Sequence, residues 1–413
     1  MGRVSRRQLL VMAAGAAVGH GAAATSGAFA AEAELSDEEI REILFAEAEP
    51  GGGPLDRAII KPFWFQKEEG SRVTPHWPAD NVSFDYAHLL ALPNSEEPFA
   101  LSASVLEQLL AANALQRNAQ LPKLLFALRG CSLAGGADHT AWAASHGVRA
   151  TRPNHLDLRC LFGVWDTSSN LLALFKGSTV PTFDYVEKQA EGSMRCNMLP
   201  TGLHHYRVGA HKGERQPGAF RQQTPLWVIR NKKNPIYAAN DAGIEWDDLD
   251  GDLPFDNIHA AMLSSNSKPP YFSSCGCQTV SGAYRNGVPT GAWAEFRKAA
   301  GLAHPPSFVP GSNQNTQDDG REFDYVLLTG KEAQVAASGN GAQLRALRFG
   351  ASGDGVSELQ EKLAAQPGGG VAKTGVFDWK TLGGVLRWQK DNQLAPTGIL
   401  VAETAAKLGL RWS

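Results

Sequence analysis

The sequence predicts a mixed protein in which a β-rich body is followed by a small three-helix unit. Short apolar runs separated by Gly, Pro and Asn recur through residues 123–330, and this spacing is typical of strands. Residues 346–413 instead place apolar side chains such as Val356, Leu359 and Leu363 on one helical face. The chain has 413 residues, more than one ordinary core holds, so we expect more than one domain.

The amino-terminal residues 1–31 have the three parts of a secretory signal. Arg6 and Arg7 precede an apolar run over residues 9–24, and an Ala-Phe-Ala sequence at residues 28–30 offers small side chains for cleavage. Paired arginines next to an apolar run indicate the twin-arginine export route, so we expect a periplasmic or secreted protein. The alternative is an uncleaved membrane anchor, but a run this rich in Ala and Gly would partition poorly into lipid.

Charge and hydropathy argue against two classes of partner. The formal net charge is −3, and loss of an arginine-containing leader makes it more negative. A mildly acidic protein has no general attraction for nucleic acid, so we expect no nucleic-acid partner. No stretch after the leader is long and apolar enough to cross a bilayer, so we expect no stable membrane insertion after signal cleavage. The sequence does not indicate an oligomeric state.

Two further segments carry no chemistry of their own. Residues 32–122 form an amino-terminal region without an assigned role, which ends in a helix-like run from residue 104 to residue 121. Residues 331–345 are rich in Ala, Ser, Gly and Gln, and this composition is typical of a linker. The predicted order is therefore signal, amino-terminal region, β-rich domain over 123–330, linker and carboxy-terminal unit over 346–413.

The carboxy-terminal unit contains a repeat of apolar, Gly, Gln and Thr positions. These are Leu347, Phe349, Gly350, Val356, Leu359, Gln360, Leu363, Gly375, Phe377, Thr381, Val385, Trp388, Gln389, Gly398, Thr404 and Leu408. The pattern resembles the peptidoglycan-binding domain family, which implies a three-helix fold, peptidoglycan as the partner and association with the cell wall. Gly375 and Gly398 are placed for tight turns, and Thr381 and Thr404 are placed to cap helices.

A histidine and a cysteine in the β-rich domain suggest an acyl-transfer site. His259 is followed by the segment Ser274-Cys275-Gly276-Cys277. In acyl transfer a thiolate attacks a carbonyl, and an imidazole takes up and returns the proton. Gly276 would let a substrate carbonyl approach the backbone, and the amide of Cys277 would join an oxyanion hole. Ser274 would orient the histidine or bind substrate.

This pattern resembles the L,D-transpeptidase family, whose signature places a Ser-any-Gly-Cys segment downstream of a histidine. The resemblance implies a β-sandwich over roughly residues 155–330, with Cys277 as the nucleophile and His259 as the base. The chain departs from the family after both residues. Alanines follow the histidine where Gly is usual, and Gln278 and Thr279 follow the cysteine where the family has a hydrophobic residue and Arg. That arginine engages the substrate, so transpeptidation and hydrolysis both stay open.

The five cysteines support the same site by their number. They are Cys131, Cys160, Cys196, Cys275 and Cys277. Disulfides form outside the cytoplasm, and an odd count leaves one thiol as a candidate nucleophile. Cys275 and Cys277 are two residues apart, a spacing that rarely gives a relaxed disulfide, so we expect Cys275 to pair elsewhere or to be buried.

Three functions are therefore compared. The first is a Cys-dependent acyl transferase or peptidase that acts on peptidoglycan peptides and needs no cofactor. The second is a non-catalytic peptidoglycan-binding protein with a degenerate catalytic fold. The third is a metal-dependent wall hydrolase that uses His204, His205, His211 or His259. Adjacent histidines on a strand point to opposite faces, and no zinc-protease spacing occurs, so we expect no metal site.

Overall fold

The computed structural model describes residues 97–411 apart from 154, 156, 183–184, 186–194, 212–215, 232–243, 262–271 and 311–314. The signal predicted over residues 1–31 and most of the amino-terminal region 32–122 lie outside the described residues. Within the described part of the chain, no helix is long and apolar enough to cross a membrane.

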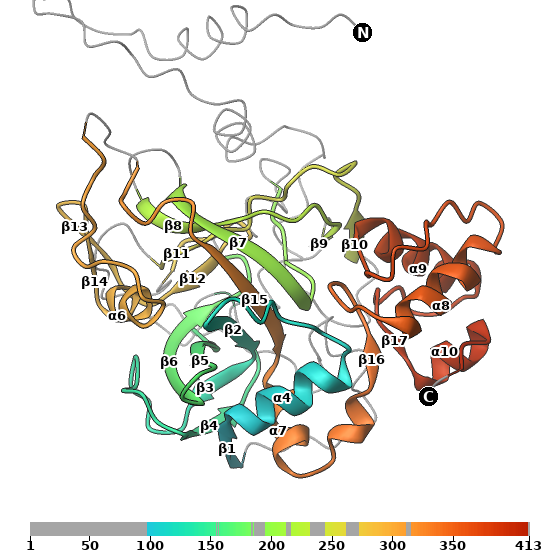
Figure 1. The fold of residues 1–413 in the computed structure, drawn as a ribbon, viewed down its shortest axis with the longest axis horizontal. Coiled ribbons are helices and arrows are strands. Elements are labelled where there is room, and N and C mark those ends of the chain that lie inside the picture. The colour runs from blue at the N-terminus through green and yellow to red at the C-terminus, as the bar shows by residue number, and fades with distance from the viewer. Residues whose placement is uncertain are drawn as a thin grey trace, which may run out of the picture. The chain divides into compact units, whose positions relative to one another are not determined.

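Eight strands close into one barrel-like sheet in the order β11-β12-β6-β5-β2-β15-β7-β8 (Figure 1). They are β2 (Lys123–Arg129), β5 (Cys160–Asp166), β6 (Leu171–Ser178), β7 (Gly202–His211), β8 (Gln216–Gln222), β11 (Ile258–Ala260), β12 (Gln278–Val280) and β15 (Glu322–Thr329). The prediction of a β-rich body is confirmed. The finer prediction of an L,D-transpeptidase-like sandwich is not, because these strands share a single closed sheet.

Aromatic side chains fill the core of this barrel. Phe162 of β5, Phe175 of β6 and Phe220 of β8 each meet the ring of Phe296, which comes from helix α6 (Ala292–Ala299). Gly163 makes the packing possible, since a Cβ there would lie 2.1 Å from the ring of Phe126. Strands such as β2 and β5 are therefore apolar almost throughout instead of alternating, because both faces are buried.

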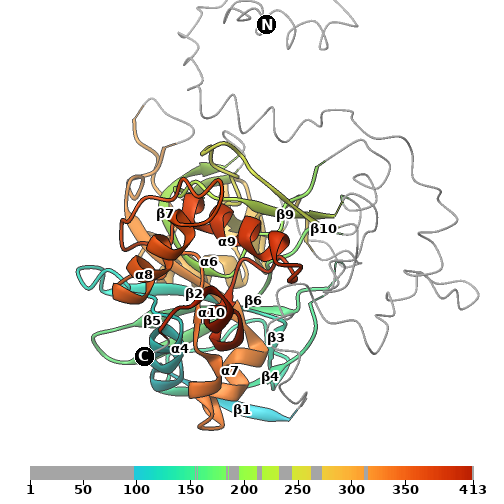
Figure 2. The same ribbon diagram turned by 90° about the vertical axis from the view of Figure 1, so that its right-hand side faces the viewer.

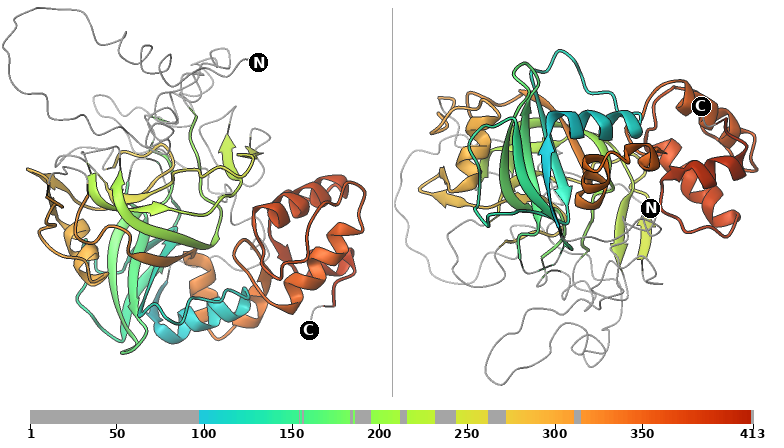
Figure 3. Two further views of the ribbon diagram at one scale, coloured as in Figure 1. Left: turned by 45° about the horizontal axis from the view of Figure 1, so that its top comes forward. Right: turned by 90° about the horizontal axis from the view of Figure 1, so that it is seen from below.

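Smaller sheets and helices lie beside the barrel (Figure 3). In a three-stranded sheet, β4 (Ser145–Ala150) lies between β1 (Pro98–Ser102) and β3 (Cys131–Leu133). Two further pairs are β9 (Val228–Asn231) with β10 (Ile244–Asp247), and β13 (Ala283–Arg285) with β14 (Val288–Thr290). The helix predicted up to residue 121 ends sooner, as α4 (Ala103–Ala112), because the Asn113 side chain donates to the Leu109 carbonyl and closes it.

Residues 331–345, which were predicted as a linker between domains, contain helical structure. Helix α7 (Gly330–Ala337) follows β15 directly, and a 3₁₀ turn (Gly341–Leu344) comes next. A capping box starts α7, since the Thr329 hydroxyl accepts from the Glu332 amide while the Glu332 carboxylate accepts from the Thr329 amide. The helix buries Ala333 and Ala336. An Ala-rich composition therefore fits a buried helix here, because alanine is also a strong helix former.

The carboxy-terminal unit has three helices among its described residues, α8 (Asp354–Ala364), α9 (Trp379–Asp391) and α10 (Ala402–Leu408) (Figure 2). The short strands β16 (Ala346–Leu347) and β17 (Leu400–Val401) pair beside them. The three-helix prediction is confirmed. Gly375 and Gly398 have positive φ values of 72° and 70°, as the turn prediction requires.

An internal repeat of glutamine, threonine and glycine explains the sequence pattern of this unit. The buried Gln360 side chain accepts from the amides of Thr374 and Gly375. Gln389 repeats the arrangement by accepting from the amide of Gly398. Each glutamine thus ties a helix to the turn that follows it, and the glycine gives that turn its left-handed backbone.

Thr381 and Thr404, predicted to cap helices, do not occupy the N-cap positions. Each lies three residues further on, in the first turn of its helix. Helix α9 begins after Asp378, whose carboxylate accepts from the Thr381 amide at 2.8 Å. In α10 the Thr404 hydroxyl lies in the first turn and accepts from the Val401 amide at 2.9 Å. Both threonines therefore satisfy the start of a helix from inside it.

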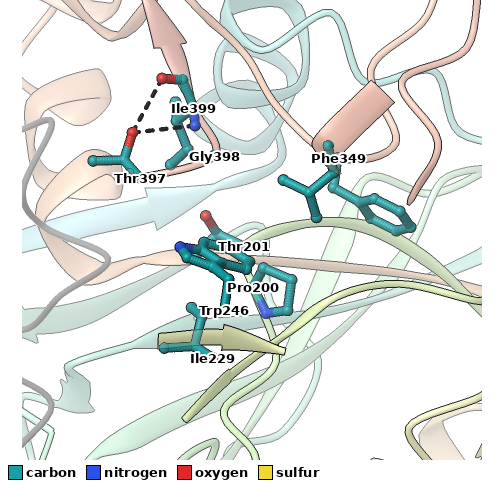
Figure 4. A pocket seen from close by; sticks show the side chains of 9 residues that line it. Pro200, Thr201, Ile229, Trp246, Phe349, Thr397, Gly398 and Ile399 are labelled. Atoms are coloured by element: carbon teal, nitrogen blue, oxygen red, sulfur yellow. Dashed lines mark hydrogen bonds between the residues drawn. The ribbon is translucent and has the colours of Figure 1, made fainter. Parts of the chain in front are cut away.

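The unit packs on the body of the protein through a buried ion pair and an apolar seam. Arg348 forms an ion pair with Glu332 of α7, and both side chains are fully buried. Arg348 also donates to the Thr201 hydroxyl at 2.9 Å. Around a small apolar pocket at this seam lie Pro200, Thr201, Ile229, Trp246, Phe349, Leu382, Thr397, Gly398 and Ile399 (Figure 4). The unit is therefore fixed to the body by specific contacts.

Candidate functional site

Neighbouring strands of the barrel bring one sulfur and two imidazoles together. β7, β8, β11 and β12 are consecutive in the sheet (Figure 1). His211 ends β7, His259 lies in β11, and Cys277 directly precedes β12. One nitrogen from each ring and the Cys277 sulfur all lie within 4.8 Å of one another. The two histidines are buried and the cysteine residue is partly exposed.

The two imidazole rings stack, with centroids 4.4 Å apart and planes 11° from parallel. His211 Nε2 lies 4.0 Å from Cys277 Sγ, and the thiol is also 3.5 Å from the Phe255 carbonyl. The site therefore contains the Cys277 and His259 pair that the sequence predicts. It also contains His211, which the sequence suggests only as a metal ligand.

Hydrogen bonds fix the tautomer of His259. Its Nδ1 lies 2.7 Å from the carbonyl oxygen of Ala260. A carbonyl can only accept, so Nδ1 carries the hydrogen, and the neutral ring has its lone pair on Nε2. The neutral His259 ring therefore has its hydrogen on Nδ1 and its basic nitrogen at Nε2.

The neutral form of His211 has the opposite tautomer. The Asn257 carbonyl oxygen accepts from the Gln222 amide at 2.9 Å, which turns the Asn257 NH₂ group toward His211. That group lies 3.0 Å from His211 Nδ1 and can only donate. His211 Nδ1 must accept, so Nε2 carries the hydrogen and faces the Cys277 sulfur. The stacked histidines thus offer one acceptor and one donor.

The loop before Cys277 is braced from within by Ser274. The Ser274 hydroxyl accepts from the Gly276 amide at 3.0 Å and donates to the Cys277 carbonyl at 2.7 Å. Its own amide donates to the Thr182 hydroxyl at 2.7 Å. Ser274 therefore shapes the loop, whereas Ala260 and Asn257 orient the two histidines.

Gly276 is required by close packing inside the protein. A Cβ at this position would lie 2.4 Å from Asp256 Oδ1 and 2.8 Å from the Cβ of Asn197. Its φ of 154° also disfavours other residues. The glycine thus lets the Cys277 loop lie directly against the buried Asp256 carboxyl.

Asp256 is an ionisable group held in a protein interior. Burial raises its pKa to about 7, although the Asn197 amide and the positive charges of Arg230 and Arg129 act in the opposite direction. Asn197 donates to its Oδ1 at 3.3 Å, and Oδ2 has no hydrogen-bond partner among the described residues. The sequence did not point to this residue, because nothing local distinguishes it from the surface aspartates nearby.

The remaining histidines do not join this group. His204 is buried, its Nε2 donates to the Pro200 carbonyl oxygen at 3.0 Å, and burial lowers its pKa to about 3. His205 points to the other face, where it pairs with Asp324 at 2.8 Å. The strand alternation expected for this pair is therefore confirmed.

A metal ion would meet two suitable ligands and one unsuitable one. Two imidazoles and a thiolate are ligands that zinc accepts, and the neutral His259 ring carries its lone pair on Nε2. A ligating histidine normally donates its other N–H to an acceptor. His211 instead receives a hydrogen bond on Nδ1 from Asn257, which leaves the hydrogen on Nε2. In this arrangement the hydrogen on His211 Nε2 therefore makes that nitrogen unsuited to coordinate a metal ion.

Comparison with known proteins identifies one part of the chain. No curated protein and no solved structure matches it. Residues 352–408 match the family described as "Putative peptidoglycan binding domain". This match covers α8, α9 and α10, the helices that the glutamine repeat ties together. The chain therefore carries a peptidoglycan-binding domain at residues 352–408, which supports targeting to the cell wall.

Proposed function

We propose that the protein is a Cys277-dependent acyl transferase or peptidase that acts on peptidoglycan peptides and is held at the wall by its carboxy-terminal domain. One observation supports this most directly: the Cys277 sulfur lies with two histidines whose hydrogen bonds give them opposite tautomers. The peptidoglycan-binding domain in the same chain supports wall peptides as the substrate.

In the proposed reaction, His259 Nε2 takes the thiol proton and the Cys277 sulfur attacks the carbonyl carbon of a peptide bond. The tetrahedral intermediate collapses to a thioester as the leaving amine takes that proton from His259. Water or an acceptor amine then attacks the thioester and gives its proton to His259. The Cys277 sulfur leaves and is reprotonated, so the enzyme returns to its starting state.

His211 and the loop amide have separate roles in this scheme. The Nε2–H of His211 stabilises negative charge on the Cys277 sulfur, because it donates toward it while Asn257 keeps the ring in this tautomer. The Cys277 amide is the proposed oxyanion donor, presented by the loop that Ser274 and Gly276 shape.

The decisive test combines thiol labelling with turnover, in the presence of a reductant. Cys277→Ala should abolish labelling by iodoacetamide at this site and any cleavage or transfer of wall tetrapeptides, whereas Cys275→Ala should retain both. His259→Ala should lose several orders of magnitude in rate, since nucleophile and base act as a unit. Wild-type turnover by Cys277→Ala, or labelling of Cys275 in its place, would refute the assignment.

A matched pair of variants isolates the role of His211. His211→Ala removes the donor and should lower the rate about 100-fold, the usual cost of one preorganised donor. His211→Gln keeps an N–H donor and should recover part of that loss. Equal rates for the two variants would mean that His211 acts only through packing.

Export through the twin-arginine route belongs to the same proposal. Replacing Arg6 and Arg7 with lysines should trap the precursor in the cytoplasm, because that route reads the arginine pair. Fractionation followed by immunoblotting measures the result. Unimpaired export of the double variant would indicate the general secretion route.

The competing functions give different results in the same assays. A non-catalytic wall-binding protein would co-sediment with sacculi but would neither label at Cys277 nor turn over wall peptides. A metal-dependent hydrolase would lose activity after dialysis against a chelator and regain it with zinc. The proposed thiol enzyme should keep its activity through that treatment.

A further inference from the structure

Two cysteines outside the proposed catalytic group are in direct contact. Cys275 Sγ lies 3.2 Å from Cys196 Sγ and 2.9 Å from the Arg195 carbonyl oxygen, so its one hydrogen can point to either acceptor. The two residues are 79 positions apart in the sequence, so only the fold brings them together. Neither thiol belongs to the acyl-transfer scheme.

Backbone hydrogen bonds hold both partners in place. The Asn197 amide donates to the Cys275 carbonyl at 2.8 Å, which fixes the two segments side by side next to the sulfurs. Met198 is anchored in turn by two backbone hydrogen bonds to Ile229. The sulfurs need to approach only from 3.2 Å to about 2.0 Å to form a bond, so little backbone movement is required.

We propose that Cys196 and Cys275 form a disulfide that clamps the loop carrying Cys277, with a disulfide compound of an oxidising compartment as the oxidant. The inference stands on the contact between the two sulfurs and is independent of whether Cys277 is catalytic. It also leaves Cys277 outside the bond, two residues beyond the clamp.

Exposure sets the order of the exchange steps. Cys275 is partly exposed and Cys196 is fully buried, so the thiolate of Cys275 attacks the external disulfide first. One thiol leaves and a mixed disulfide forms on Cys275. Cys196 then attacks the Cys275 sulfur and releases the second thiol. Two electrons pass to the reagent, and its two sulfurs leave as thiols with the protons that the cysteines lose.

The clamp acts on the geometry next to the nucleophile. Cys275 lies between Ser274 and Gly276. The Ser274 hydroxyl bonds to the Gly276 amide and to the Cys277 carbonyl, and these two hydrogen bonds set the position of Cys277. A covalent tie at Cys275 restricts this loop and lowers the entropy of the unfolded chain. Oxidation should therefore raise the melting temperature of the protein.

The test uses the full-length protein and oxidised glutathione. After incubation, denaturation and alkylation, peptide mapping should show one Cys196–Cys275 cross-link and two fewer alkylated thiols than in the reduced protein. The cross-link should vanish in Cys196→Ser and in Cys275→Ser. Cys160→Ser removes a buried cysteine outside the pair and should leave the cross-link intact.

Three results would overturn the proposal. They are a lasting glutathione adduct on Cys275, a Cys275–Cys277 cross-link, or five alkylated thiols after oxidation. The mapping of wild-type protein decides the question even if a variant folds poorly. Because the readout is a covalent bond and not turnover, a failed clamp and a failed acyl-transfer proposal are distinguishable.

Discussion

The carboxy-terminal unit and the Cys277 loop obtain their order in different ways. In the unit, Gln360 and Gln389 each bond to a turn that lies within 15 positions of them. In the loop, the groups around Cys277 come from β7, from β11 and from the segment at Cys196. A structure held by nearby residues leaves a local pattern in the sequence, whereas a site assembled from distant strands does not. The unit, with its local pattern, matches a known family over residues 352–408.

The buried ion pair that joins the unit to the body should show the largest stability effect. Arg348→Met removes the cation that pairs with the buried Glu332 carboxylate and should destabilise the protein by about 3–5 kcal/mol. The double variant with Glu332→Leu should recover much of this loss. Urea denaturation of the single and double variants measures both values. If Arg348→Met costs under about 1 kcal/mol, the unit and the body are not coupled by this pair.

The site around the Cys277 loop should depend on pH through Asp256. Its pKa is raised from 3.8 to about 7 by burial, so the folded state binds its proton more tightly than the unfolded chain does. The contribution of Asp256 to stability is therefore complete below about pH 4 and is lost as pH rises to about 7, by up to about 4 kcal/mol.

The variant Asp256→Asn isolates this effect. The asparagine does not titrate, so the variant should not lose the stability that wild type loses between pH 4 and 7. The unfolding free energy of the variant minus that of wild type should therefore rise with pH. Urea denaturation at pH 5 and pH 8 measures the difference. His155 and His204 act in the opposite direction, because burial lowers their pKa values to about 4 and about 3, but they are the same in both proteins. A constant difference between variant and wild type would contradict the assignment.

A local feature of the unit should show the smallest effect. Asp378→Ala removes the side chain that caps α9 and should cost about 1 kcal/mol. Asp378→Asn keeps an acceptor and serves as the control. Thermal unfolding of both variants gives the comparison. Loss of several kcal/mol from Asp378→Ala would mean that this residue is part of a wider network.

The sequence predicts the strands of the β-rich body but does not predict how they pair into a closed barrel. Apolar runs such as β2 and β5 identify strands, yet they do not say which strands pair. The pairing of β2 with the distant β15 closes the barrel, and it depends on contacts between residues some 200 positions apart. The composition of residues 331–345 likewise did not reveal helix α7, since alanines suit a buried helix as well as a flexible segment.

The candidate site could be predicted only where its members share a motif. Cys277, Gly276 and Ser274 lie in one short segment, and His259 lies near enough to be associated with it. His211 and Asn257 could not be assigned roles in this way. Their positions depend on the pairing of β7 with β8 and of β8 with β11.

The sequence by itself determined the helices and turns of the peptidoglycan-binding domain, because the residues that stabilise them are close together along the chain. The sequence also singled out Cys277 among the five cysteines, because Cys277 directly follows the Ser-Cys-Gly segment. Only the tertiary structure decided the tautomers of His211 and His259, the burial of Asp256 and the contact between Cys196 and Cys275. Each of these depends on the distance between groups from separate strands and loops, and that distance is set when the barrel closes.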